Sequence, residues 1–367
     1  MRLVVKIGSN ILTTGALGLN EKRIGQIVKV INEIILAGHE VIIVSSGAVA
    51  AGMRRLGIKD KPTEIMLKQA AAAVGQPALM WAYERCFNEY GRKTAQVLLT
   101  RDALSDRTMY LNSKNTLATL LKYGIVPVIN ENDTVATDEI KFGDNDQLAA
   151  LVSGVVEADR LVILSDVDGF YEENPRTCPS AKIIPLVNSI TDDLLRRAGG
   201  SGSAVGTGGM YSKLLAAKKA MRLGVTVNII NGKKPTQIVD IISGKSRGTE
   251  FRPAGGKLSA RKGWIAFGIR PKGTLLLDAG AAKALAAHNR SLLPSGIVGI
   301  EGEFKAGEAV YCVDSEANRI AKGLTNYSSD DIRRIMGRRT SEIAEILGYQ
   351  YSEEVIHRDN MVSLAQG

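Results

Sequence analysis

Residues 3–10 read LVVKIGSN, a β-branched apolar run that contains one lysine. The apolar residues are those of a strand that is buried on both faces of a parallel sheet. Lys6 does not fit such a strand, because taking an ammonium out of water costs several kcal/mol unless a partner compensates. Two interpretations are open: the side chain reaches solvent at an edge of the sheet, or it lies where the strand ends and points at an anion.

Similar runs recur along the first 230 residues and alternate with amphipathic or alanine-rich stretches. We expect strands at 3–7, 41–44, 95–99, 126–129, 161–164 and 225–230. We expect helices at 21–36, 68–90, 107–121, 147–155 and 212–223. Strands that alternate with helices predict an α/β fold, with a mainly parallel sheet sandwiched between helices.

The length of 367 residues exceeds one ordinary core, so we expect two domains. From residue 244 the chain becomes dense in glycine, serine and basic residues, and short runs separated by turns follow. These changes predict a first domain at 1–250, a linker at 251–272, a small and mostly β domain at 273–350, and a tail at 351–367.

Composition places the chain among soluble globular proteins, with 45% hydrophobic and 23% charged residues. No apolar stretch approaches the roughly 20 residues that span a bilayer, and we expect no membrane partner and a cytoplasmic location. Cys86, Cys178 and Cys312 form no C-x-x-C pair, which is typical of a reducing compartment. The three histidines are equally scattered, so neither a zinc site nor a Ser-His-Asp triad is visible.

The net charge of +9 raises the question of a nucleic-acid partner. Residues 1–255 carry +7 of it and residues 256–367 only +2. The local basic cluster at residues 333–339 is more typical of a solvated helix face than of an RNA groove. The charge therefore gives little support to RNA binding by the C-terminal part.

Polar side chains follow several of the expected strands. SSGAVAAG follows 41–44, NENDTVATDEIKFGDND follows 126–129, and SDVDGFY follows 161–164. Ligands of open α/β sheets bind beyond the carboxyl ends of the strands, often at helix N-termini. Together with KIGSN after the first strand, these loops predict a ligand site at one edge of the sheet.

The stretch GGSGSAVGTGGMYSK, residues 199–213, adds a glycine-rich loop before a helix that we expect to start near Met210. Such a loop lets backbone N–H groups approach a phosphate, with Lys213 in the first helical turn. A flexible surface loop is the alternative. Known nucleotide motifs do not apply, because Val239 stands where a Walker A motif needs glycine and the Rossmann spacing is missed by one residue.

Taken in order, VVKIGSN, IIVSSGAVAAG, PVINENDTVAT, KFGDNDQLAALV and GTGGMYSK closely resemble the glutamate 5-kinase (γ-glutamyl kinase) family of the amino acid kinase superfamily. LLPSGI and GEFKAGEAV, within residues 273–347, resemble the PUA domain of many bacterial members. The resemblance runs from Leu3 to the end of the chain. It implies the amino acid kinase fold and phosphorylation of L-glutamate by ATP to L-glutamyl 5-phosphate, the first step of proline biosynthesis, with feedback inhibition by proline.

The same resemblance implies the site residues. Lys6 and Lys213 would be the catalytic cations, and Asp146 would orient them. ATP would be held by Lys6, Gly8, Ser9, Ser165, Asp166, Thr207, Gly208, Gly209, Met210, Tyr211, Ser212 and Lys213. Glutamate would be held by Ser46, Gly47, Asn130, Asp133, Asp144 and Asn145. Mg²⁺ would sit on the ATP phosphates, without a dedicated protein site.

The chemistry agrees with these residue types. The acceptor is a carboxylate with an ordinary pKa of about 4.3, which needs no general base. Fixed cations and Mg²⁺ offset the charge that develops on the phosphoryl group. The alternatives are an N-acetylglutamate kinase or other carboxylate kinase, and an RNA-binding accessory protein that uses the PUA domain. Expected partners are L-glutamate, ATP, proline as inhibitor, glutamyl phosphate reductase and further copies of the chain in a dimer or tetramer.

Overall fold

The structure is a computed structural model. It describes residues 1–13, 18–60, 62–135, 145–175, 177–199, 209–254, 260–288 and 290–364. The chain forms two compact units, each with its own sheet and core. The first unit consists of Met1–Leu104 and Thr108–Lys257, and the second of Ser105–Arg107 and Leu258–Gly367.

The first unit is built on an eight-stranded sheet in the order β3-β4-β2-β1-β5-β7-β8-β6. Its strands are β1 Arg2–Ile7, β2 Glu40–Ser45, β3 Thr94–Leu99, β4 Val126–Glu131, β5 Arg160–Ser165, β6 Leu186–Val187, β7 Thr226–Asn231 and β8 Thr249–Phe251. All neighbours pair in parallel except β7 and β8. The predicted α/β fold with a mainly parallel sheet is therefore confirmed.

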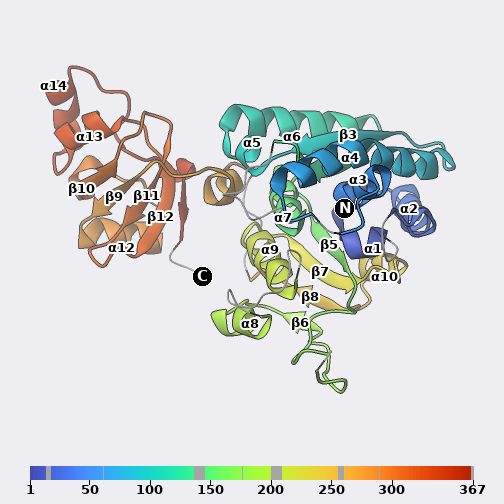
Figure 1. Ribbon diagram of the computed structural model, residues 1–367. Helices are drawn as coiled ribbons and strands as arrows, with labels where there is room; N and C mark the ends of the chain where they lie inside the picture. Colours follow the sequence, from blue (N-terminus) through green and yellow to red (C-terminus); the bar gives the residue numbers. More distant parts are fainter. Residues whose placement is uncertain are drawn as a thin grey trace. The chain divides into compact units, whose positions relative to one another are not determined.

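Helices cover both faces of this sheet (Figure 1). The helices before residue 258 are α1 Ser9–Leu12, α2 Glu21–Leu36, α3 Ala48–Leu56, α4 Ile65–Asn88, α5 Arg101–Ser105, α6 Arg107–Lys122, α7 Asn145–Val155, α8 Asp192–Arg197, α9 Met210–Arg222 and α10 Gln237–Ile242. α2 begins at the side-chain cap of Asn20, which accepts a hydrogen bond from the Arg23 amide. α9 begins at Met210, as predicted.

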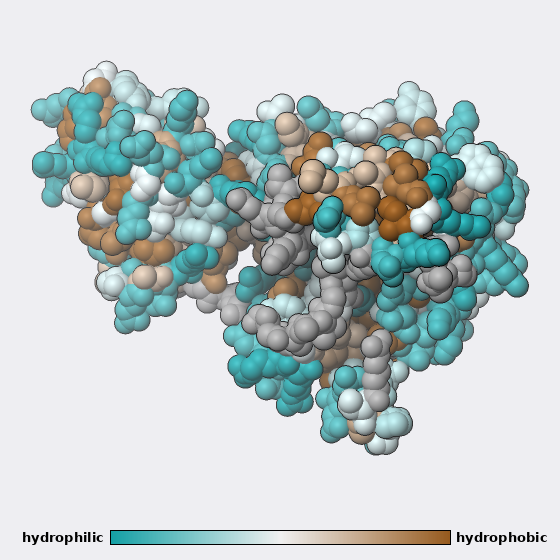
Figure 2. Space-filling view, viewed as in Figure 1, coloured by the Kyte–Doolittle hydropathy of each residue, from teal (hydrophilic) through white to brown (hydrophobic). Residues whose placement is uncertain are grey.

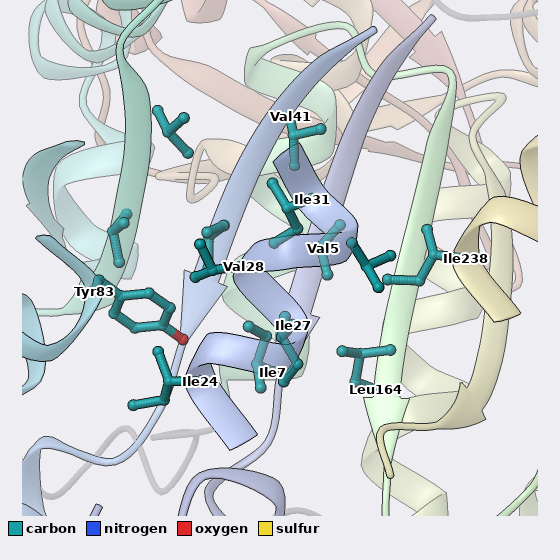
Figure 3. Close-up of a cluster of buried hydrophobic side chains, with 14 of the residues drawn as sticks. Val5, Ile7, Ile24, Ile27, Val28, Ile31, Val41, Tyr83, Leu164 and Ile238 are labelled. Carbon is teal, nitrogen blue, oxygen red and sulfur yellow. The ribbon is translucent and has the colours of Figure 1, made fainter. Parts of the chain in front are cut away.

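Alternation along β1 assigns its side chains to the two faces. Leu3, Val5 and Ile7 lie in the core that α2, α4 and α10 form on one face. Figure 3 shows Ile24, Ile27, Val28 and Ile31 of α2 against this strand, with Tyr83 of α4 and Ile238 of α10 beside them. Successive side chains of a strand point to opposite faces, so Lys6 points to the other face, which α7 packs against.

The second unit has a five-stranded sheet in the order β10-β9-β11-β12-β13. Its strands are β9 Gly273–Leu277, β10 Ile297–Gly302, β11 Ala309–Val313, β12 Arg319–Leu324 and β13 Met361–Ser363. Its helices are α11 Ala260–Gly263, η1 Trp264–Gly268, α12 Ala279–His288, η2 Pro294–Gly296, α13 Ser329–Ile335, η3 Thr340–Glu342, α14 Ile343–Leu347 and η4 Arg358–Asn360. The stretch that we expected to be a tail thus contains β13, and the expected linker contains α11 and η1.

The predicted strands of the first unit are present, with ends that differ by one or two residues. The elements that were not predicted are α1, α3, α5, α8, α10, β6 and β8. α3 is only nine residues long, and its first half lies in SSGAVAAG, which we expected to be a loop after the strand at 41–44. It forms because α4 packs closely along it through Gly52 and Gly75.

The surface of the first unit is mainly hydrophilic in Figure 2, with hydrophobic residues gathered over α3 and α4. Exposed large apolar residues on these helices are Leu56, Met66, Leu67 and Trp81. Among the residues that the structure describes, no helix is long and apolar enough to cross a membrane.

Candidate active site

Lys6 and Lys213 meet at one carboxylate. The Lys6 Nζ atom lies 2.5 Å from Oδ1 of Asp146, and the Lys213 Nζ atom lies 3.2 Å from Oδ2. Lys6 comes from β1, Lys213 from α9 and Asp146 from α7. Their side chains are buried, with exposed fractions of 4%, 8% and 0% in the same order. The first interpretation of Lys6, a side chain that reaches solvent at the sheet edge, is therefore wrong.

The charges in this cluster favour an anionic ligand. Burial acts to raise the pKa of Asp146, but the Lys6 and Lys213 ammonium groups outweigh it and hold that pKa below its ordinary value. Asp146 is thus a carboxylate at neutral pH, and it contacts both ammonium groups. Two cations held together in a buried site attract negative charge.

A cavity of about 440 Å³ lies beside this cluster, and Lys213 is in its wall. Five of the predicted ATP-binding residues line it: Ser165, Asp166, Gly209, Met210 and Lys213. The other lining residues are Asn10, Val167, Gly169, Phe170, Tyr171, Glu173, Asn174, Pro175, Arg197, Ala198 and Gly199. The cavity therefore joins the end of β5 to the start of α9.

The remaining predicted ATP-binding residues are placed as follows. Gly8 is next to the cluster, since a Cβ atom there would lie 3.6 Å from Lys6 Nζ. Ser9 opens α1, and Tyr211 and Ser212 lie in the first turn of α9, outside the cavity wall. Thr207 and Gly208 lie outside the described residues.

A chain of side-chain amides lies beside the cluster, because Asn145 precedes Asp146 at the start of α7. Asn145 Nδ2 is 2.8 Å from Ser46 Oγ and 3.0 Å from Asn130 Oδ1. Asn130 Nδ2 in turn donates to Gln76 Oε1 at 2.8 Å. The ends of β2 and β4 and the starts of α3 and α7 thus bring three of the predicted glutamate-binding residues together.

Two further predicted glutamate-binding residues lie at the same strand ends. Gly47 caps the N-terminus of α3 with a φ of 114°, which favours glycine. Asp133 follows β4 by two residues, and burial raises the pKa of its carboxyl to about 6. Asp144 lies outside the described residues.

Sequence reasoning missed Gln76, which comes from α4 and has no polar neighbours in the sequence to mark it. It also missed Phe170, Tyr171 and Arg197 of the cavity wall, although the loop SDVDGFY was singled out. Among the described residues, no group of three or more His, Cys, Asp and Glu could hold a metal ion.

Comparison with known proteins gives matches to both parts of the chain. Residues 1–231 match the amino acid kinase family, and residues 273–347 match the PUA domain. A glutamate 5-kinase of Geobacter sulfurreducens is 53% identical over 363 residues, which cover 99% of this chain and 97% of that protein. A glutamate 5-kinase of Caldanaerobacter subterraneus subsp. tengcongensis is 50% identical over 367 residues, which cover 100% and 99%.

Proposed function

Because the chain belongs to the amino acid kinase family, we propose that it is an ATP-dependent glutamate 5-kinase that forms L-glutamyl 5-phosphate, the first step of proline biosynthesis. The full-length relatives named glutamate 5-kinase support this substrate. The observation that carries the proposal is the pair of buried ammonium groups on Asp146, beside a cavity at the carboxyl edge of the sheet.

The proposed roles of the charged groups follow from their positions. ATP occupies the cavity, with its phosphates toward the first turn of α9. Lys213 binds the terminal phosphate from the cavity side, and Lys6 approaches the same phosphoryl group from β1. Asp146 holds both ammonium groups in place before ATP binds. Since these ammonium groups are buried and fixed, they stabilise the negative charge of the transition state without reorganisation.

Mg²⁺ would be held by the phosphates of ATP and would supply positive charge there. Gly8 fits this arrangement, because the absence of a side chain leaves space beside the Lys6 ammonium. Ser165 and Asp166 at the end of β5 bind the nucleotide. The masking of negative charge lets a second anion, the substrate carboxylate, approach.

Glutamate is proposed to bind at the amide chain. Its ammonium is attracted by the Asp133 carboxylate and by the Asn145 carbonyl oxygen. Ser46 and the first-turn amides of α3, whose N-terminus follows Gly47, suit a carboxylate. The γ-carboxylate then points at the phosphoryl group near Lys6.

We also propose that residues 1–250 and 273–350 act as the two domains, that proline inhibits the enzyme, and that the product passes to a reductase. Exposed apolar residues of α3 and α4 support assembly into a dimer or tetramer. The free thiols Cys86, Cys178 and Cys312 support a cytoplasmic location.

The test is trapping of the acylphosphate as hydroxamate, with ATP and Mg²⁺, for L-glutamate, N-acetyl-L-glutamate and L-aspartate. The proposal expects signal with L-glutamate alone, because acylation removes the charge that Asp133 binds and aspartate is too short. Signal with N-acetyl-L-glutamate alone would show instead that the protein is an N-acetylglutamate kinase. L-proline added to the glutamate reaction tests the inhibition.

A further inference from the structure

Gln76 enters the candidate site from a helix that no motif assigned to it. It lies in α4 directly after Gly75, and a Cβ atom at Gly75 would be only 1.8 Å from the Ala48 carbonyl oxygen. α4 therefore lies directly against Ala48, the first residue of α3, which follows Ser46 and Gly47. This crossing brings the Gln76 side chain, 92% buried, to the proposed glutamate position.

The hydrogen bonds fix which end of the Gln76 amide is nitrogen. The backbone N–H of Glu131 donates to Asn130 Oδ1 at 2.9 Å, so this atom is the oxygen. The other end of that amide, Nδ2, donates and requires an acceptor, which is Gln76 Oε1 at 2.8 Å. The Gln76 Nε2 group then carries both of its N–H donors away from Asn130.

Two atoms of this amide chain have no partner among the described residues. They are the donor Gln76 Nε2 and the acceptor Asn145 Oδ1, and both are buried. Buried polar groups are nearly always paired, since an unpaired one loses its water without compensation. One unsatisfied donor and one unsatisfied acceptor, joined through Asn130, are complementary to a ligand that presents an anion and an ammonium together.

We propose that Gln76 binds the amino-acid substrate by donating from Nε2 to its α-carboxylate. The α-ammonium, which shares a carbon atom with that carboxylate, donates to Asn145 Oδ1. Gln76 is thus a specificity-determining residue of the site, because an α-carboxamide offers Nε2 only a neutral acceptor where the α-carboxylate offers a charged one. The inference rests on the proposed function for the identity of the substrate, but the binding geometry does not depend on catalysis.

The experiment measures the binding of L-glutamate and of its α-carboxamide, L-isoglutamine, by calorimetry for the wild type and Gln76→Met. Methionine keeps the length and the apolar packing and removes the donor. We expect Kd for L-glutamate to rise about tenfold to a hundredfold, as for a lost hydrogen bond to a charged group. We also expect the preference for L-glutamate over L-isoglutamine to fall by at least fivefold, while Kd for ATP stays unchanged.

Gln237→Met is the matched control. Gln237 lies in α10, and its Oε1 atom is also buried without a partner among the described residues. Gln237→Met should leave the binding of L-glutamate unchanged. If Gln76→Met lowers the melting temperature severely, Gln76→Glu is used instead. Glutamate keeps the shape of the side chain and replaces the N–H donor by an anionic oxygen. This variant should abolish L-glutamate binding, because the new anion repels the α-carboxylate.

Each outcome decides between the claims. Unchanged binding and unchanged preference in a folded Gln76 variant overturn the role of Gln76. A second outcome is that the wild type binds L-glutamate, the Gln76 variant does not, and the wild type forms no hydroxamate. This outcome overturns the proposed function and leaves the role of Gln76 standing. Failure of the wild type to bind L-glutamate overturns both.

Discussion

Replacing Asp146 by asparagine tests whether its carboxylate compensates for the burial of two lysines. The substitution keeps the shape of the side chain and leaves the Lys6 and Lys213 ammonium groups, 4% and 8% exposed, without the carboxylate that both contact. Breaking a buried ion pair by removing one partner costs about 3–5 kcal/mol. For a unit of this size each kcal/mol lowers the melting temperature by about 2–4 °C, which gives a fall of about 6–20 °C.

The assay is thermal unfolding, followed by circular dichroism, with and without ATP. ATP should raise the melting temperature of Asp146→Asn more than that of the wild type, because its phosphates supply the negative charge that the variant lacks. Asp240→Asn is the matched control, since Asp240 also contacts two cations, Lys245 and Arg247, but at the surface. It should leave the melting temperature almost unchanged. An equally small change for Asp146→Asn would refute the reasoning.

Three further predictions follow from the described residues. Burial raises the pKa of Asp133 to about 6, so its carboxyl is neutral below that pH and ionised above it. KM for L-glutamate should therefore rise as the pH falls through 6. Asp133→Asn should remove this dependence of KM on pH. Gly75→Ala forces α4 away from Ala48 and should lower the free energy of unfolding, measured in urea, by about 1–3 kcal/mol. Its control is Gly25→Ala in α2, where the new Cβ atom would meet only Cys86 Sγ at 3.9 Å, and this variant should not be destabilised. Lys213→Met should lower kcat roughly a hundredfold to a thousandfold with little change in KM for L-glutamate; equal losses in both would contradict its position at the phosphoryl group.

The central strands β1, β2, β4, β5 and β7 were predictable because they are apolar runs rich in β-branched residues and are largely buried, whereas the short β6 and β8 gave no such signal. The position of Lys6 in such a run signalled a ligand site, and the polar loops after the strands indicated which edge it occupies. The partner of Lys6 was not determined by this pattern. The contact with Asp146 depends on how α7 lies on the sheet, which is a matter of tertiary packing.

Gln76 shows where sequence reasoning stops. It follows an alanine-rich stretch of α4, and nothing local distinguishes it from a residue on a solvated helix face. Its role depends on the close packing of α4 on α3 at Gly75, which only the folded chain reveals. Phe170 and Arg197 were missed for a related reason, because the cavity joins two loops that are distant in sequence.

The most direct test of the account is the single-turnover rate of phosphoryl transfer from ATP to L-glutamate, compared between the wild type and Lys6→Met. The account predicts that the wild type transfers the phosphoryl group and that Lys6→Met does so roughly a hundredfold to a thousandfold more slowly, while the affinity for L-glutamate is kept. Transfer at the wild-type rate by a folded Lys6→Met protein would contradict the central claim that the buried ammonium groups stabilise the transition state.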